Sequence, residues 1–313
     1  MSDPVLASTG AAAGPAATLR ALLERSVDYA GLFPPAALDM EHAVRQYAAH
    51  RRSPARWLLG RFVLPATRLD EFAVAAERHR QLAEPWRLSA LVGPDTEDDL
   101  ARVAQFNAAA GRGDPTVDTV EGRAATPAGI AGLAARVPRS LTAYVELPAT
   151  ADPAPLAAAC AAARVRAKLR TGGVTADAFP PAVVVTRFLA ACASAALPCK
   201  LTAGLHHALR GDYRLTYADD GPRGAMLGFV NVFAAALLLH AGLPPAEAER
   251  VLAEDDPSAF AFDDAELRWR DHVVPLARVR AARERLVVAF GSCSFDEPVS
   301  ELTALGWMGG AEA

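Results

Sequence analysis

Two lysines stand inside apolar segments that each close on a glycine turn. Lys168 belongs to the run Ala-Lys-Leu-Arg-Thr-Gly-Gly and Lys200 to the run Cys-Lys-Leu-Thr-Ala-Gly, 32 residues further on. A lysine in a buried strand is costly unless its charge is paired or its pKa is lowered, and a neutral lysine amine is a nucleophile. The two segments therefore predict a site for amine chemistry.

The elements that would hold these lysines recur along the whole chain. Eight short apolar or β-rich segments alternate with stretches of helical spacing, and six of the seven gaps between them fit one strand-helix unit. These segments are 27–33, 57–64, 87–92, 116–121, 141–147, 164–170, 198–203 and 286–291. Eight such units predict an α/β fold, the (β/α)8 TIM barrel, with a doubly wound open sheet as the alternative.

The gap between the seventh and eighth segments is too long for one helix. It predicts a helical insertion over 208–285 that can act as a lid, with a loop at 210–223, a helix at 224–242 and helices near 245–254 and 263–284. The loop could equally be an ordinary surface hairpin. The rest of the chain is expected to form a single barrel domain over 16–313, preceded by a flexible tail at 1–15.

Alternation along the strands indicates which polar side chains face the barrel interior. The apolar positions of three consecutive strands leave Glu146, Lys168, Arg170 and Lys200 pointing inward, close to the carboxyl ends of those strands. Active sites of TIM barrels lie at that end. We predict that these residues share one cavity. The alternative is a structural charge ladder that fills the barrel.

Four segments resemble one enzyme family in the same order. Lys168-Leu169-Arg170-Thr171-Gly172 is similar to the Schiff-base lysine segment of the deoxyribose-phosphate aldolases, which are class I (Schiff-base) aldolases. Lys200-Leu201-Thr202-Ala203-Gly204 is similar to their second lysine segment. Val117-Asp118-Thr119-Val120 resembles the fourth-strand region that supplies a catalytic aspartate, and Phe290-Gly291-Ser292-Cys293-Ser294 resembles the last-strand segment that helps to hold substrate phosphate.

The resemblance implies a lysine-dependent lyase or aldolase. Lys168 would add to a substrate carbonyl, and Lys200 would lower the pKa of Lys168 by like-charge repulsion. Asp118 or Glu146 would act as general acid or base, and Glu121 could replace Asp118, since strict alternation turns only one of these two inward. Ser292 and Ser294 would contact the substrate.

The chain also departs from the family pattern. After the second lysine the family has Gly-Gly-Ile-Arg, whereas this chain has Ala203-Gly204-Leu205-His206-His207. Arg170 stands where the family has a small hydroxyl residue and could bind a carboxylate with two hydrogen bonds. The sequence therefore predicts a small oxo compound as the substrate, and Arg170 favours one that bears a carboxylate.

Other polar residues give the alternatives. His206 and His207 follow the seventh strand and are expected to bind substrate or shuttle protons. With barrel carboxylates they could instead form a metal-dependent lyase or hydrolase site. Asp28 and Tyr29 end the first strand and could reach the cavity. A non-catalytic barrel that binds an anion through the lysines is the third possibility. Cys293 has no base beside it in sequence and is not expected to be a nucleophile.

Composition narrows the class of protein. The 313 residues carry a net charge of −4 with a pI near 6.0, which gives no basic footprint for nucleic acid. Four cysteines without a CxxC spacing and no evident signal peptide predict a cytoplasmic protein. The apolar run 224–239 is too short to span a membrane and predicts a buried helix. A buried helix of this kind can pack at a subunit interface, so we expect a homo-oligomer. No metal or cofactor is expected, only a small-molecule substrate.

Overall fold

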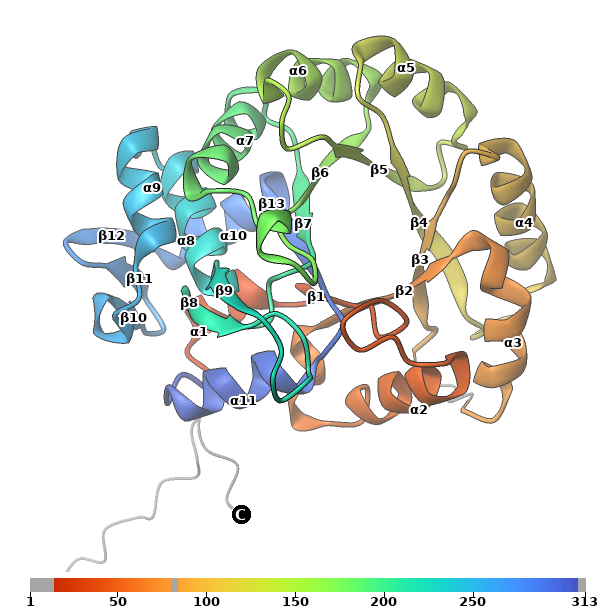
Figure 1. Ribbon diagram of the computed structural model, residues 1–313, viewed down its shortest axis with the longest axis horizontal. Helices are drawn as coiled ribbons and strands as arrows, with labels where there is room; N and C mark the ends of the chain where they lie inside the picture. The colour runs from red at the N-terminus through yellow and green to blue at the C-terminus, as the bar shows by residue number, and fades with distance from the viewer. Residues whose placement is uncertain (1–13, 80–83, 309–313) are drawn as a thin grey trace, which may run out of the picture.

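A computed structural model describes residues 14–79 and 84–308, and their central feature is a closed barrel of eight parallel strands. Around the barrel the strands follow the order β1-β13-β7-β6-β5-β4-β3-β2 (Figure 1). Their bounds are β1 (Val27–Tyr29), β2 (Leu59–Pro65), β3 (Arg87–Leu91), β4 (Thr116–Arg123), β5 (Thr142–Leu147), β6 (Arg166–Arg170), β7 (Cys199–Thr202) and β13 (Val287–Ser292). All eight predicted segments are strands, and the predicted TIM barrel is confirmed.

Helices surround the barrel where the sequence has helical spacing between strands. They are α2 (Met40–His50), α3 (Leu69–Glu77), α4 (Thr96–Ala109), α5 (Pro127–Arg136), α6 (Pro153–Ala163) and α7 (Ala182–Ser194), with α1 (Ala17–Leu23) before β1 and α11 (Asp296–Ala304) after β13. Local chemistry fixes several starts. The Asp152 side chain caps α6, which opens on Pro153, and Thr126 caps α5, which opens on Pro127.

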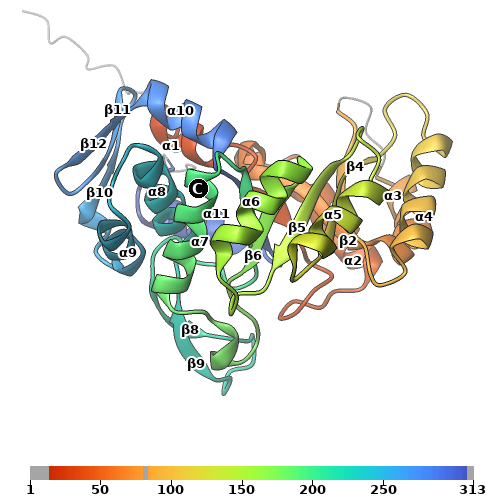
Figure 2. The same ribbon diagram turned by 90° about the horizontal axis from the view of Figure 1, so that it is seen from above.

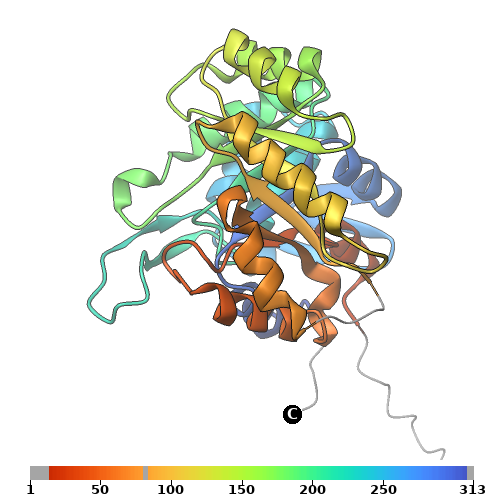
Figure 3. The same ribbon diagram turned by 90° about the vertical axis from the view of Figure 1, so that its right-hand side faces the viewer.

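The insertion between β7 and β13 is mixed rather than helical. It contains the hairpin β8 (Gly211–Arg214) and β9 (Arg223–Met226), the helices α8 (Phe229–His240) and α9 (Pro245–Ala253), the sheet β10 (Phe260–Phe262), β11 (Glu266–Trp269) and β12 (His272–Pro275), and α10 (Leu276–Arg285). It lies beside the barrel wall, while the hairpin projects from one end of the barrel (Figures 2 and 3).

Two predicted elements of the insertion are therefore wrong. The helix near 263–284 is a three-stranded sheet followed by a shorter helix, because residues 266–269 alternate between buried and exposed side chains, which is the period of a strand. The helix at 224–242 begins only at Phe229, since residues 223–226 pair with β8. The segment 210–223 belongs to an antiparallel hairpin with an irregular tip, which confirms the surface hairpin given as one of its two interpretations.

Helix α8 is apolar on nearly all sides and is buried within its own chain. It packs against α7, α9, α10 and β13, and residues 229–238 are all buried. Its one polar core residue, Asn231, donates to the carbonyl oxygens of Val251 and Glu254. Since the chain itself covers this helix, α8 gives no support for a subunit interface. A homo-oligomer stays a prediction.

One apolar stretch, Ala176–Ser194, is long enough by length and composition to cross a membrane. It includes α7, which packs between α6 and the helices of the insertion on the outside of the barrel. A single stretch of this kind is weak evidence for a membrane span, and a cytoplasmic location stays a prediction. The predicted tail at 1–15 lies outside the described residues except for 14 and 15.

Candidate active site

A cavity of about 670 Å³ opens at the carboxyl end of the barrel strands, where TIM-barrel enzymes keep their active sites. Charged and nucleophilic side chains come to it from the strands β4, β5, β6 and β7, from α4, and from the segments that follow β7 and β13. The polar side chains that line it include Asp99, Glu121, Arg123, Glu146, Lys168, Arg170, Lys200, Thr202, His206 and Cys293.

Strand register places three of these groups in one layer. Glu146 on β5 pairs with Lys168 on β6, and Lys168 pairs in turn with Lys200 on β7. The Lys168 amine lies 2.8 Å from Glu146 Oε2 and 2.8 Å from Glu121 Oε2. The predicted convergence of Glu146, Lys168 and Lys200 on one cavity is confirmed by this register and by the cavity lining.

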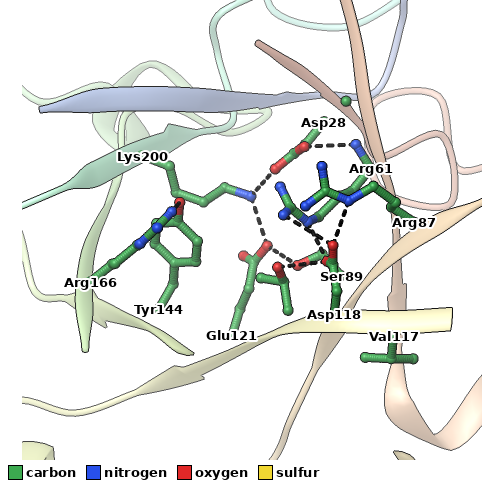
Figure 4. A network of polar contacts seen from close by, with 12 residues as sticks. Asp28, Arg61, Arg87, Ser89, Val117, Asp118, Glu121, Tyr144, Arg166 and Lys200 are labelled. Carbon is green, nitrogen blue, oxygen red and sulfur yellow. Dashed lines mark hydrogen bonds and ion pairs between the residues drawn. The ribbon is translucent and has the colours of Figure 1, made fainter. Parts of the chain in front are cut away.

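Lys200 is held by two carboxylates. Its amine lies 2.5 Å from Asp28 Oδ2 and 2.7 Å from Glu121 Oε1, and Figure 4 shows the side chain reaching between them. Burial favours the neutral amine, but Asp28 and Glu121 outweigh it and raise the pKa of Lys200 above its ordinary value. Lys200 is therefore a permanent cation at neutral pH.

Glu121 stands between the two lysines, with one carboxylate oxygen on each amine. It also accepts a hydrogen bond from Ser89 Oγ at 2.6 Å. Burial would raise the pKa of Glu121, but the two lysines outweigh burial and hold it well below its usual range. The structure thus differs from the expectation of two ammonium groups that crowd each other, because a shared carboxylate separates them. Glu121 therefore fixes the positions of both lysine amines and also lines the cavity.

Asp118 lies in a lower layer of the barrel and does not line the cavity. Its carboxylate is 2.6 Å from Arg61 Nε and 2.5 Å from Arg87 Nε, as Figure 4 shows. Burial acts against the ionised form, but the two arginines keep the pKa of Asp118 below its ordinary value. The structure therefore places the aspartate expected to be catalytic in a structural ion-pair cluster.

A bulge in β4 explains how Asp118 and Glu121 both face inward. Leu88 of β3 pairs with Val117, but the next residue of β3, Ser89, pairs with Thr119, so Asp118 is an extra residue in its strand. A bulge shifts the alternation of side chains by one position. The sequence argument assumed strict alternation, which allowed only one of the two carboxylates inside.

Two arginines reach the cavity beside Glu146. Arg123 is largely exposed, and its Nε lies 3.1 Å from Glu146 Oε1. Arg170 donates from Nε to the carbonyl oxygen of Gly172 at 3.0 Å and is exposed at the end of β6. Both retain guanidinium donors that can bind a carboxylate. Arg123 was missed, although it lies two residues after Glu121 on the same strand.

The two consecutive histidines point to different surroundings, as expected for an extended segment. His206 lines the cavity, with Nδ1 3.0 Å from Glu297 Oε2. His207 Nδ1 lies 2.5 Å from Glu301 Oε1, and the His207 ring stacks on the ring of Tyr213. Over residues 14–79 and 84–308, no three His, Cys, Asp or Glu side chains are grouped as metal ligands. The metal-dependent alternative therefore has no ligand set in this part of the chain.

The remaining predicted site residues are placed by the ends of their strands. Asp28 faces the barrel interior, so its neighbour Tyr29 faces the helices, where its hydroxyl donates to Gln46 Oε1 at 2.7 Å. Tyr29 therefore cannot contact a ligand in the cavity. Ser292 is buried behind His206, and Ser294 accepts a hydrogen bond from the backbone N–H of Glu297. Neither serine lines the cavity.

Lysine usage singles out the same site. The sequence contains two lysines, Lys168 and Lys200, against 30 arginines. All the other side chains in the Lys and Arg class are therefore arginines. An arginine guanidinium stays protonated and does not act as an amine nucleophile. This count needs no structure and would have marked both residues directly.

The chain was compared with models of protein families and with curated proteins. No protein-family model matches the chain, and no curated protein matches it. Fold and site together define its class: a TIM barrel whose carboxyl-terminal end holds two lysines on three carboxylates, an arrangement consistent with an enzyme.

Proposed function

We propose that this protein is a Schiff-base lyase of the class I aldolase type that acts on a small oxo acid. The observation that carries the proposal is the setting of Lys168. Its amine lies in a cavity at the catalytic end of the barrel, within 2.8 Å of Glu146, a carboxylate that can accept its proton.

The steps balance with the groups present. The Lys168 nitrogen forms a bond to the substrate carbonyl carbon, and the carbonyl oxygen leaves as water with two protons of the former ammonium, relayed by Glu146. The resulting iminium keeps the third proton. The iminium then accepts the electron pair of the bond between the α and β carbons of the bound substrate as that bond breaks, and the β-hydroxyl proton passes to a carboxylate as the aldehyde departs. The carboxylate returns this proton to the α carbon of the enamine that remains, and water hydrolyses the resulting iminium to release the product and free Lys168. The reverse steps make the bond.

Lys200 supports this chemistry without taking part in it covalently. Its side chain is 1% exposed and its amine is fixed by Asp28 and Glu121, so it holds Glu121 ionised and in place. Glu121 in turn orients the Lys168 amine. Lys168 is the better candidate for the nucleophile, because its side chain is 5% exposed and its second carboxylate, Glu146, is itself accessible from the cavity.

The arginines support a carboxylate on the substrate. Arg123 and Arg170 approach the cavity from β4 and β6, on either side of Glu146. Two guanidinium groups beside one carboxylate leave a positive surface for an anion. A phosphate is less favoured as the anion. After its second lysine this chain lacks the glycine-rich loop that binds phosphate in the family it resembles.

Reductive trapping tests the proposal directly. The protein is incubated with borohydride and a panel of pyruvate, 2-oxobutanoate, acetaldehyde and glycolaldehyde, and the adduct is located by peptide mass spectrometry. With two lysines in the chain, the only other primary amine is the terminal one. We expect an oxo-acid adduct on Lys168, absent in Lys168→Arg and retained in Lys200→Arg. An adduct confined to the terminal amine would contradict the proposal.

A non-catalytic anion-binding barrel is the second candidate, because Arg123 and Arg170 bring two further cationic side chains to the cavity beside the lysines. Lys168→Arg separates the two functions, since it keeps the charge and removes the amine chemistry. If the variant binds pyruvate as tightly as the parent, and neither protein yields an adduct with borohydride, the binding function is favoured. Isothermal titration calorimetry provides the measurement.

A further inference from the structure

Cys293 sits at the cavity beside a histidine and a carboxylate that the proposed lyase chemistry does not use. It follows β13, lines the cavity and is a free thiol. Its Sγ lies 4.0 Å from both ring nitrogens of His206, and His206 Nδ1 lies 3.0 Å from Glu297 Oε2. A nucleophile, a base and a group that orients the base are thus arranged in series.

The surroundings of these groups favour the protonated form of His206. Tyr217, from the tip of the β8–β9 hairpin, places its hydroxyl 3.6 Å from Cys293 Sγ and 3.2 Å from Glu297 Oε2. Burial would lower the pKa of His206, but Cys293 and Glu297 outweigh it and raise that pKa to about 9. Ser292 also faces the His206 ring, at 3.5 Å.

Other charged and titratable groups near this cluster come from β1 and α11. Burial raises the pKa of the Tyr29 hydroxyl, and Cys293 and Asp296 raise it as well. Tyr29 therefore interacts electrostatically with both Cys293 and Asp296. His207 has a different partner, Glu301. The cluster therefore consists of His206 and Tyr217 beside the Cys293 sulfur, with Glu297 in contact with both of them.

The other three cysteines provide a contrast within the same chain. Cys160, Cys192 and Cys199 are fully buried in the apolar core. Burial raises the pKa of Cys160 to about 12, and a contact with Cys199 together with burial raises that of Cys192 well above its ordinary value. Buried thiols of this kind are inert. Cys293 alone of the four joins the cavity.

We propose that Cys293, His206 and Glu297 form a second nucleophilic centre in the cavity, one that takes up small aldehydes reversibly. His206, as the imidazolium, holds the proton that the thiol has given up, and the sulfur forms a bond to the aldehyde carbon. The electron pair of the carbonyl moves to its oxygen, which takes the proton from His206. The product is a thiohemiacetal, and no oxidant or further reactant is needed. This centre does not depend on Lys168 or on the proposed lyase function.

Alkylation by iodoacetamide, followed residue by residue with peptide mass spectrometry, tests the nucleophile. We expect Cys293 to react at pH 7 about tenfold or more faster than each of the other cysteines, because the thiolate is the reacting form. His206→Asn should lower the rate at Cys293 by about tenfold or more at pH 7. The rates of parent and variant should converge at pH 10, where a thiol ionises without help. An unchanged rate at pH 7, or a loss at both pH values, would overturn the proposal.

Protection by acetaldehyde tests the ligand class. Millimolar acetaldehyde should slow alkylation of Cys293 equally in the parent protein and in Lys168→Arg. Protection in the parent alone would mean that an imine on Lys168 blocks access, and absence of protection in both would mean that the thiol takes up no aldehyde. Either result overturns aldehyde uptake. Glu297→Gln is the matched variant for orientation of His206, and we expect a smaller loss of alkylation rate at pH 7 than in His206→Asn.

Discussion

At the scale of single residues, one carboxylate organises the site. Glu121 neutralises part of both lysine charges, and each of its oxygens faces a different amine. Without it, two cations would stand in a buried layer with only Asp28 and Glu146 to balance them. We therefore expect stability to depend chiefly on Glu121 and the proposed proton transfer at Lys168 to depend on Glu146.

Replacing the two glutamates separately should show this division. Glu121→Gln should lower the free energy of unfolding by about 3–5 kcal/mol, because removing one partner of a buried ion pair leaves charge uncompensated. Glu146→Gln, nearer the cavity mouth, should cost about 1–3 kcal/mol in stability but slow trapping at Lys168 by about 100-fold or more. Urea unfolding and the trapping rate are the measurements. Equal stability losses would argue against a central role for Glu121.

The raised pKa of His206 makes stability depend on pH. The folded-state value of about 9 lies above the ordinary value of 6.5, so the contribution is complete below pH 6.5 and is lost as the pH rises through 9. The unfolding free energy should fall by about 1–3 kcal/mol over that window. The urea midpoint at pH 6 and pH 9.5 tests this. His206→Asn should show a smaller fall than the parent.

At the scale of elements, regular alternation could be predicted and its interruptions could not. Strict period two was enough to place Glu146, Lys168 and Lys200 on the inner face, because β5, β6 and β7 pair without a shift. The bulge at Asp118 depends on how β4 pairs with β3, and the residues of β4 alone do not indicate this pairing. The sheet at 260–275 was missed for a different reason: its alternation was present but was read as part of a helix.

The same bulge turns both Asp118 and Glu121 inward, although the sequence predicted that only one of them would face the interior. Asp118→Asn should lower the unfolding free energy by about 2–5 kcal/mol, since it leaves Arg61 and Arg87 without their shared anion. The trapping rate at Lys168 should stay within about twofold of the parent, because Asp118 does not reach the cavity. A loss of trapping in a folded variant would return Asp118 to a catalytic role.

At the scale of the whole molecule, a closed barrel provides the rigid frame and the insertion extends one side of it. The barrel, its eight strands and the position of the cavity could be predicted from spacing and alternation. The contacts of His206 and Cys293 with Glu297 and Tyr217 could not, because the partners lie 76 to 91 residues apart in sequence. Neither pairing leaves a local signature.

Acid should unfold this frame through its buried carboxylates. Lysines and arginines outweigh burial and lower the pKa values of Glu121, Glu146 and Asp118. Carboxylates with lowered folded-state pKa values stabilise the protein above their ordinary values and lose that contribution as the pH falls. The unfolding free energy should therefore decrease steadily below about pH 4.5. Glu121→Gln should flatten this decrease, which urea titrations between pH 6 and pH 3 can measure.

Both lysines lie in barrel strands, so a protease that is specific for lysine can measure how fast the barrel unfolds. An endoproteinase that cuts after lysine has two target bonds in the chain, following residues 168 and 200, and each lies within a closed sheet. The native surface offers it nothing to cut. Digestion into the fragments 1–168, 169–200 and 201–313 would then report the rate at which the barrel itself comes apart, free of the background from loops and ends.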